Sequence, residues 1–291
     1  MRYALLALLW CGACSDGHKP FANPGLRVTA EWLRDHLGDP GLRVFDGRPR
    51  AEYDAGHIPG AISLPVGDTF DPVGAKNYPL RGEALQHLLA SRGVPTDRKV
   101  ITYDVGGETE GPRLFWTLEY AGHPDAAVLD GGLAAWRAVG GALSKDAPPV
   151  AAAAFQATTT ESRLQDKQSC AIALGHSSSA VLDVRSAAEY RGDLVKAKQG
   201  GHMPGAINID WKLNFAGDKL KDPDALRALY TEHGITPDKQ VITHCQTGQR
   251  SSVSYWALRL LGYPKVGNYA GSWAEWGNDP AMPKLNGDQP R

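Results

Sequence analysis

Gly201-His202-Met203-Pro204-Gly205-Ala206-Ile207 is the second occurrence of a pattern that the chain first carries as Gly56-His57-Ile58-Pro59-Gly60-Ala61-Ile62. Both occurrences follow an Ala-Glu-Tyr triplet, and both are preceded by a short apolar run that ends in Asp-x-Arg. Pro-Gly pairs are turn formers, and the apolar runs before them have the length of buried strands. The motif therefore marks the same strand and turn in two places.

The repeat extends far beyond this motif. Four further pairs of segments match in the same order, namely 99–104 with 240–245, Trp116 with Trp256, 122–124 with 262–264, and 130–136 with 270–276. Two copies are too few for a solenoid, so the sequence predicts a tandem duplication of one domain. We expect domains at 28–145 and 161–285, joined by a linker at 146–160 that is rich in Pro, Ala and Thr.

Within each copy, short β-branched runs alternate with longer amphipathic segments. Residues 181–184 and 241–244 have the pattern of buried strands, whereas 224–230 and 251–261 have helical spacing. This alternation predicts α/β domains, each with a mostly parallel sheet flanked by helices. In such sheets, binding sites lie beyond the carboxyl ends of the strands.

Composition excludes several classes of protein. The 291 residues contain 31 Lys+Arg and 32 Asp+Glu, so the net charge is -1, and nucleic acid is not an expected partner. Hydrophobic residues make up 42% of the chain, which is typical of a globular protein. The chain has only four cysteines, too few for a disulfide scaffold.

The first residues have the features of an export signal. An apolar run at 3–10, too short to span a bilayer, leads to Gly12-Ala13-Cys14, which predicts a signal peptide at 1–13 and a tether at 14–27. The run also resembles a bacterial lipobox, which would make Cys14 a lipid anchor. We therefore expect an exported, periplasmic protein, and the alternative is a buried N-terminal helix.

The Cys245 loop is the candidate active site. It joins the predicted strand at 241–244 to the helix at 251–261 and reads Cys245-Gln246-Thr247-Gly248-Gln249-Arg250. Backbone N–H groups in such a loop, together with the following helix N-terminus, form a site for a negative charge. A thiol in that field is favoured as the nucleophilic thiolate.

The repeated motif, this loop and the Gly-Ser-Trp-Ala-Glu-Trp segment at 271–276 resemble the tandem rhodanese family of sulfurtransferases. The resemblance implies that Cys245 takes a sulfane sulfur from a small anionic donor and passes the resulting persulfide sulfur to cyanide or another thiophilic acceptor. It implies donor contacts from the loop residues Gln246, Thr247, Gly248, Gln249 and Arg250 and from Arg191. No metal and no organic cofactor is expected.

The first copy carries Asp104 where the second carries Cys245, and its longer loop runs through Glu108 and Glu110 to Arg113. A carboxylate cannot form a persulfide, and the acidic side chains repel an anion. The first domain is therefore predicted to be non-catalytic and to buttress the second.

The donor is predicted to be thiosulfate. In the mercaptopyruvate-type and vertebrate thiosulfate-type relatives a donor-binding arginine occupies the position of Glu189, and the mercaptopyruvate enzymes have a Cys-Gly-Ser-Gly pattern that is absent here. The sequence Cys-Gln-Thr-Gly with Arg250 is more similar to bacterial thiosulfate sulfurtransferases. The alternative donor is 3-mercaptopyruvate. Two other functions stay open: a phosphatase or arsenate reductase, whose loops have five residues between Cys and Arg, and a non-enzymatic sulfur carrier.

Several residues that could be mistaken for site residues have structural explanations. His57 and His202 occur in both copies, which favours a role in the turn. Trp136 and Trp276 also recur, which favours core packing. Cys170 lies in an apolar helical stretch and is predicted to be an inert core residue.

Overall fold

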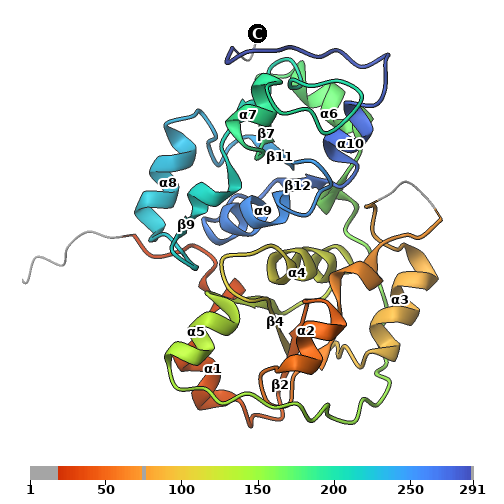
Figure 1. The fold of residues 1–291 in the computed structure, drawn as a ribbon, viewed down its shortest axis with the longest axis vertical. Coiled ribbons are helices and arrows are strands. Elements are labelled where there is room, and N and C mark those ends of the chain that lie inside the picture. Colours follow the sequence, from red (N-terminus) through yellow and green to blue (C-terminus); the bar gives the residue numbers. More distant parts are fainter. Residues whose placement is uncertain (1–18, 74–76, 290–291) are drawn as a thin grey trace, which may run out of the picture.

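The computed structural model describes residues 19–73 and 77–289, so the predicted signal peptide and Cys14 lie outside the described residues. Two α/β domains follow one another (Figure 1). The first contains β1 (Arg27–Val28), α1 (Ala30–His36), β2 (Leu42–Asp46), α2 (Arg50–Ala55), β3 (Ile62–Ser63), α3 (Gly82–Ser91), β4 (Lys99–Tyr103), α4 (Glu110–Tyr120), β5 (Ala126–Leu129) and α5 (Gly132–Ala138).

The second domain repeats this order. It contains β6 (Leu164–Gln165), α6 (Lys167–Leu174), β7 (Ser179–Asp183), α7 (Ala187–Arg191), β8 (Ile207–Asn208), α8 (Pro223–Thr231), β11 (Gln240–His244), α9 (Ser251–Leu260), β12 (Val266–Tyr269) and α10 (Ser272–Trp276), with a small hairpin of β9 (Phe215–Ala216) and β10 (Lys219–Leu220). Short 3-10 helices are η1 (Pro24–Leu26), η2 (Val66–Thr69), η3 (Glu161–Arg163) and η4 (Trp211–Asn214).

The two sheets have the same topology. Their strand orders are β1-β5-β4-β2-β3 and β6-β12-β11-β7-β8, and every pairing within them is parallel. The predicted duplication and the predicted α/β class are therefore confirmed. Residues 146–160, expected as the linker, contain no helix or strand. Within the described ranges, no helix is long and apolar enough to cross a membrane.

In both domains the histidine of the Gly-His-x-Pro-Gly motif packs against the tyrosine of the preceding Ala-Glu-Tyr triplet. His202 stacks on Tyr190 with ring centroids 3.7 Å apart, and its Nδ1 lies 2.9 Å from the Tyr190 carbonyl. Tyr190 in turn donates from its hydroxyl to the Ala206 carbonyl at 2.7 Å. His57 and Tyr53 repeat this stack at 3.8 Å. The histidines therefore join the turn to the Ala-Glu-Tyr helix, which explains their presence in both copies.

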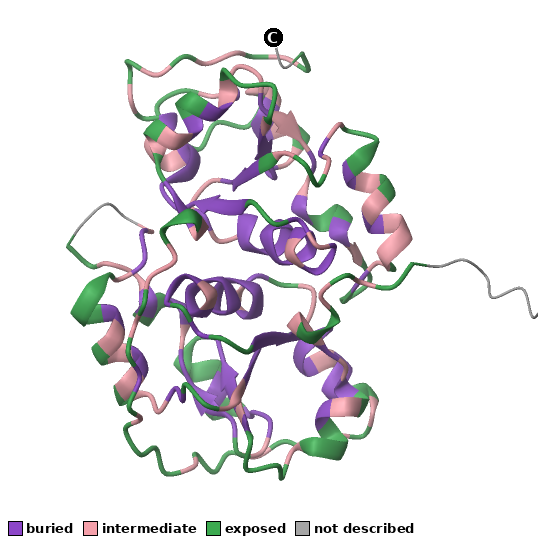
Figure 2. Cartoon of the chain, turned by 180° about the vertical axis from the view of Figure 1, so that it is seen from behind, coloured by how far each residue is buried: buried purple, intermediate pink, exposed green. Residues whose placement is uncertain are grey.

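Helices α4 and α9 pack side by side between the two sheets (Figure 1). They are buried along nearly their whole length (Figure 2), and only Glu110 and Glu119 of α4 and Arg259 of α9 are partly exposed. Glu119 accepts hydrogen bonds from Arg259 at 3.0 Å and from the Tyr255 hydroxyl at 2.5 Å. The apolar residues of both helices belong to one core that runs through both domains.

Each central helix also anchors the beginning of the opposite half. Trp116 of α4 donates from Nε1 to the Arg163 carbonyl in η3 at 3.0 Å, and Trp256 of α9 donates to the Leu26 carbonyl in η1 at 2.9 Å. These two contacts are related by the duplication. The domains are therefore fastened to each other twice by equivalent bonds.

Glu119→Gln should destabilise the chain without changing its fold. The substitution removes the charge that pairs with Arg259 across a mostly buried interface, so we expect a loss of about 1–3 kcal/mol of unfolding free energy. Urea unfolding followed by circular dichroism measures this. A wild-type midpoint in the variant would mean that the pair contributes nothing to domain docking.

Candidate active site

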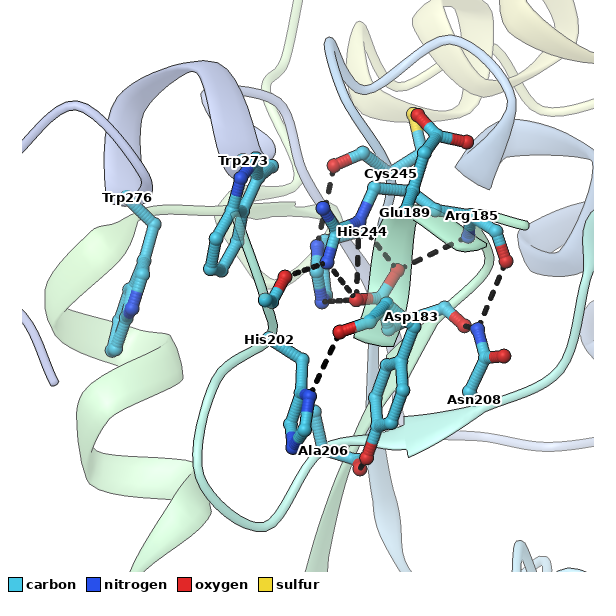
Figure 3. Close-up of polar contacts among 12 residues, drawn as sticks. Asp183, Arg185, Glu189, His202, Ala206, Asn208, His244, Cys245, Trp273 and Trp276 are labelled. Carbon is cyan, nitrogen blue, oxygen red and sulfur yellow. Dashed lines mark hydrogen bonds and ion pairs between the residues drawn. The ribbon is translucent and has the colours of Figure 1, made fainter. Parts of the chain in front are cut away.

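Cys245 directly follows β11, at the carboxyl end of the central strand, and its side chain is fully buried. Its backbone is held at both ends by the start of α10. The Cys245 N–H donates to Ser272 Oγ at 3.1 Å, and the Trp273 N–H donates to the Cys245 carbonyl at 3.0 Å. The position predicted from the strand-to-helix pattern is thus rigidly fixed (Figure 3).

The loop after Cys245 offers unpaired N–H donors. Among the described residues, no acceptor takes a hydrogen bond from the backbone N–H groups of residues 246–250. The Gly248 carbonyl accepts from Arg113 Nη1 at 2.7 Å, Asn268 Nδ2 at 2.9 Å and Ser252 Oγ at 3.2 Å. The Gly248 carbonyl thus already accepts three hydrogen bonds, whereas the loop N–H groups have no acceptor among the described residues. A loop with this arrangement can bind a negative charge.

Gly248 is required at its position. Its φ is +75°, a region that favours glycine, and a Cβ there would lie 2.7 Å from the Ala270 carbonyl oxygen. Any side chain would push the loop away from β12. This glycine therefore holds the loop close against the neighbouring strand.

Arg250 is paired rather than free. Its Nη1 and Nη2 donate to Glu189 Oε2 at 2.8 Å and Oε1 at 2.9 Å. Glu189 also forms a capping box with Ser186 at the start of α7. Burial acts to raise the pKa of Glu189, but the hydrogen bonds and charge of Arg250 outweigh it and lower that pKa to about 2. The positive charge of Arg250 is thus matched by a carboxylate.

The other predicted loop residues differ in their contacts. Gln246 donates to the Lys196 carbonyl at 3.1 Å, and its buried Oε1 has no partner among the described residues. Gln249 reaches the first domain, where it donates to Thr109 Oγ1 at 2.8 Å. Thr247 makes no side-chain hydrogen bond within the described ranges.

Arg191 is not brought into the loop. Its guanidinium pairs with Asp193 at 2.8 Å and with Asp288 at 3.6 Å, and about a third of the side chain is exposed. Its role in donor binding stays a prediction.

A buried polar network lies behind the nucleophile. Asp183 and Arg185 form a two-pronged ion pair, and Arg185 also donates to the Gly201 carbonyl at 2.8 Å. His244 lies 3.5 Å from Asp183, and burial lowers its pKa to about 4. Figure 3 shows the pair of Asp183 and Arg185. The same ion pair recurs as Asp46 and Arg48 in the first domain, so it supports the strand end in both copies.

In the equivalent loop of the first domain, the Asp104 side chain binds backbone N–H groups of the same loop. The Asp104 carboxylate accepts the Gly106 N–H at 2.8 Å and the Gly111 N–H at 3.0 Å. Burial raises the pKa of this carboxyl to about 7, although the two amides act to lower it. The loop therefore has a carboxylate in place of the cysteine, and this carboxylate takes up two of the loop amides.

The position of Arg113 differs from the one expected from the sequence. The sequence suggested that it ends the first-domain loop as Arg250 ends the second, but it lies inside α4 and is fully buried. Counted from the equivalent Trp116 and Trp256, Glu110 takes the place of Arg250. Sequence reasoning missed that Arg113 reaches the Cys245 loop, although a charged residue within the apolar stretch 111–118 was a usable signal.

No group of three His, Cys, Asp or Glu side chains within residues 19–73 and 77–289 could hold a metal ion. Cys170 is buried in α6, and burial raises its pKa well above the usual value for a thiol. Cys245 is the other free cysteine of the described ranges.

A buried cysteine at a strand end, followed by a loop with unpaired N–H groups among the described residues, lies in a duplicated α/β fold that known proteins share. The model of the rhodanese-like domain matches residues 29–139 and 165–279. The sulfur carrier protein TtuD of Thermus thermophilus is 34% identical over 285 residues, 92% of this chain and 99% of its own. The thiosulfate sulfurtransferase of Azotobacter vinelandii is 35% identical over 266 residues, 90% and 98% of the two chains.

Solved structures agree. The crystal structure of the Escherichia coli protein SseA, a 3-mercaptopyruvate sulfotransferase, has a TM-score of 0.78 at 28% identity and covers 85% of this chain and 98% of its own. The chain belongs to the rhodanese family of sulfurtransferases, with two rhodanese-like domains.

The Glu189–Arg250 pair should make stability depend on pH. The folded pKa of about 2 lies below the ordinary value of 4.5, so the carboxylate contributes stability that is fully present above pH 4.5. That contribution, about 1–3 kcal/mol, is lost as the pH falls from 4.5 toward 2. Urea unfolding over this range should show a steeper loss for the wild type than for Glu189→Gln. Identical slopes would contradict the assigned pairing.

Proposed function

We propose that the chain is a thiosulfate sulfurtransferase whose nucleophile is Cys245. The Cys245 thiolate attacks the outer sulfur of thiosulfate, the S–S bond of the donor breaks, and sulfite leaves with the bonding electron pair. Cys245 is left as a persulfide anion. Cyanide or another thiophilic acceptor then attacks the terminal sulfur and restores the thiolate.

The observation that carries this proposal is the set of free N–H groups at residues 246–250 beside Cys245. Such N–H groups can stabilise the terminal sulfur of a persulfide, as amides of an oxyanion hole stabilise an alkoxide. A small anionic donor and a thiophilic acceptor are the partners that such a site suits.

The preference for thiosulfate comes from charge. A donor that carries a carboxylate gains from a second, unpaired cation in the pocket. Here Glu189 stands where the mercaptopyruvate-type relatives have that arginine. Its carboxylate is already paired with Arg250. Loop length argues against the phosphatase alternative, because only four residues separate Cys245 from Arg250.

Thiosulfate:cyanide turnover by the wild type and by Cys245→Ser tests the mechanism. We expect thiocyanate formation by the wild type and a fall to the uncatalysed background in the variant, because serine forms no persulfide. Cys170→Ser is the matched control and should retain activity, because Cys170 lies in the core. Thiocyanate formation that survives Cys245→Ser would refute the mechanism.

The donor and the alternative functions are tested alongside. We expect a higher kcat/KM with thiosulfate than with 3-mercaptopyruvate, and the reverse order would assign the alternative donor. Phosphate-ester hydrolysis would favour the phosphatase function. Cyanolysable sulfur on Cys245 without turnover would favour the sulfur carrier.

We also propose that the chain is exported, on the strength of residues 1–14. Mass spectrometry of the mature N-terminus in a bacterial host tests this. A lipid-modified Cys14 would assign an anchored lipoprotein, and cleavage after Ala13 without lipid would assign a free periplasmic protein. An intact Met1 in the bulk of the protein would refute export.

A further inference from the structure

Arg113 is a buried charge that no carboxylate in the described part of the chain balances. Its exposed fraction is 0%, and within the described ranges no acidic side chain lies in ion-pair distance of its guanidinium. Nη1 donates to the Gly248 carbonyl at 2.7 Å and Nη2 to the Asn77 carbonyl at 3.0 Å, while Nε is buried without a partner. A buried, unpaired cation is costly, so its presence calls for a compensating interaction.

The surroundings of Arg113 hold the charge in place. The guanidinium carbon lies 4.4 Å from the ring centroid of Trp116 and 5.1 Å from that of Phe70. Burial lowers the pKa of Arg113 to about 9, and the ionisable group that acts in the opposite direction is Cys245. At neutral pH the side chain is still a cation, directed at the loop of the other domain.

The two arginines near the loop thus differ in kind. Arg250 belongs to the second domain and pairs with Glu189, whose carboxylate also lies 3.4 Å from Lys196 Nζ. Arg113 belongs to the first domain and contacts the loop itself, at the Gly248 carbonyl. The first domain therefore contributes a cation to the Cys245 loop that has no carboxylate partner within the described ranges.

We propose that Arg113 is a positioning residue of the sulfur-transfer site, through which the first domain supplies both a charge that favours an anionic sulfur on Cys245 and a hydrogen bond that orients the Gly248 peptide. This deepens the proposed function, since it concerns the same loop. It holds for any donor that leaves a charged sulfur on Cys245.

The charge at Cys245 can be measured without a sulfur donor. Iodoacetate is an anion and iodoacetamide is neutral, and both alkylate a thiolate through the same displacement of iodide. The ratio of their rates on Cys245 therefore reports the local field, whereas a general loosening of the fold changes both rates together. Alkylation of the other cysteines is subtracted with Cys245→Ser.

We expect the iodoacetate-to-iodoacetamide ratio to fall about tenfold in Arg113→Gln, which loses the charge. Arg113→Lys keeps the charge and should stay within about twofold of the wild type. Glu119→Gln, at the same α4–α9 interface but remote from the loop, is the matched control and should leave the ratio unchanged.

Equal ratios in Arg113→Gln and the wild type would overturn the inference. If Arg113→Gln does not fold, the wild type still tests it: the Cys245 ratio should exceed that of glutathione under the same conditions, and a ratio at or below that of glutathione would overturn it. Failure of thiosulfate as a donor would overturn the proposed function alone, because alkylation uses no donor.

Discussion

The Gly248 carbonyl is the point on which the site depends. Three donors from two domains bind it, and the glycine has a positive φ. The Gly248 carbonyl shares its planar peptide group with the Gln249 N–H, and the two point in opposite directions. The bonds to this carbonyl therefore fix the direction of the Gln249 N–H.

The backbone N–H groups of the two equivalent loops are used differently in the two domains. In the second domain the N–H groups of residues 246–250 have no acceptor among the described residues. In the first domain the side chain that replaces the cysteine, Asp104, accepts the Gly106 and Gly111 N–H groups itself. The first domain thus retains the fold of the site but binds part of its loop with its own carboxylate.

Much of this organisation could be predicted from sequence because it is local or repeated. The paired motifs revealed the duplication, and a cysteine at the end of an apolar run, followed by a glycine-containing loop, predicted the strand-to-helix position of Cys245 that the structure shows. Arg113 could not be assigned, because its contact with Gly248 joins residues 135 positions apart in the chain. The pairing of Arg250 was hidden for the same reason: a charge in a sequence says nothing about its partner.

The bonds donated by Trp116 and Trp256 have a consequence for the origin of the chain. Each helix of the central pair gives the other half the contact that it receives in return, which is the relation found between identical subunits about a two-fold axis. The contacts between the two halves of this chain therefore resemble those between the subunits of a symmetric dimer. Covalent fusion keeps the two halves together at any protein concentration, and once that was secured, the halves were free to become unequal.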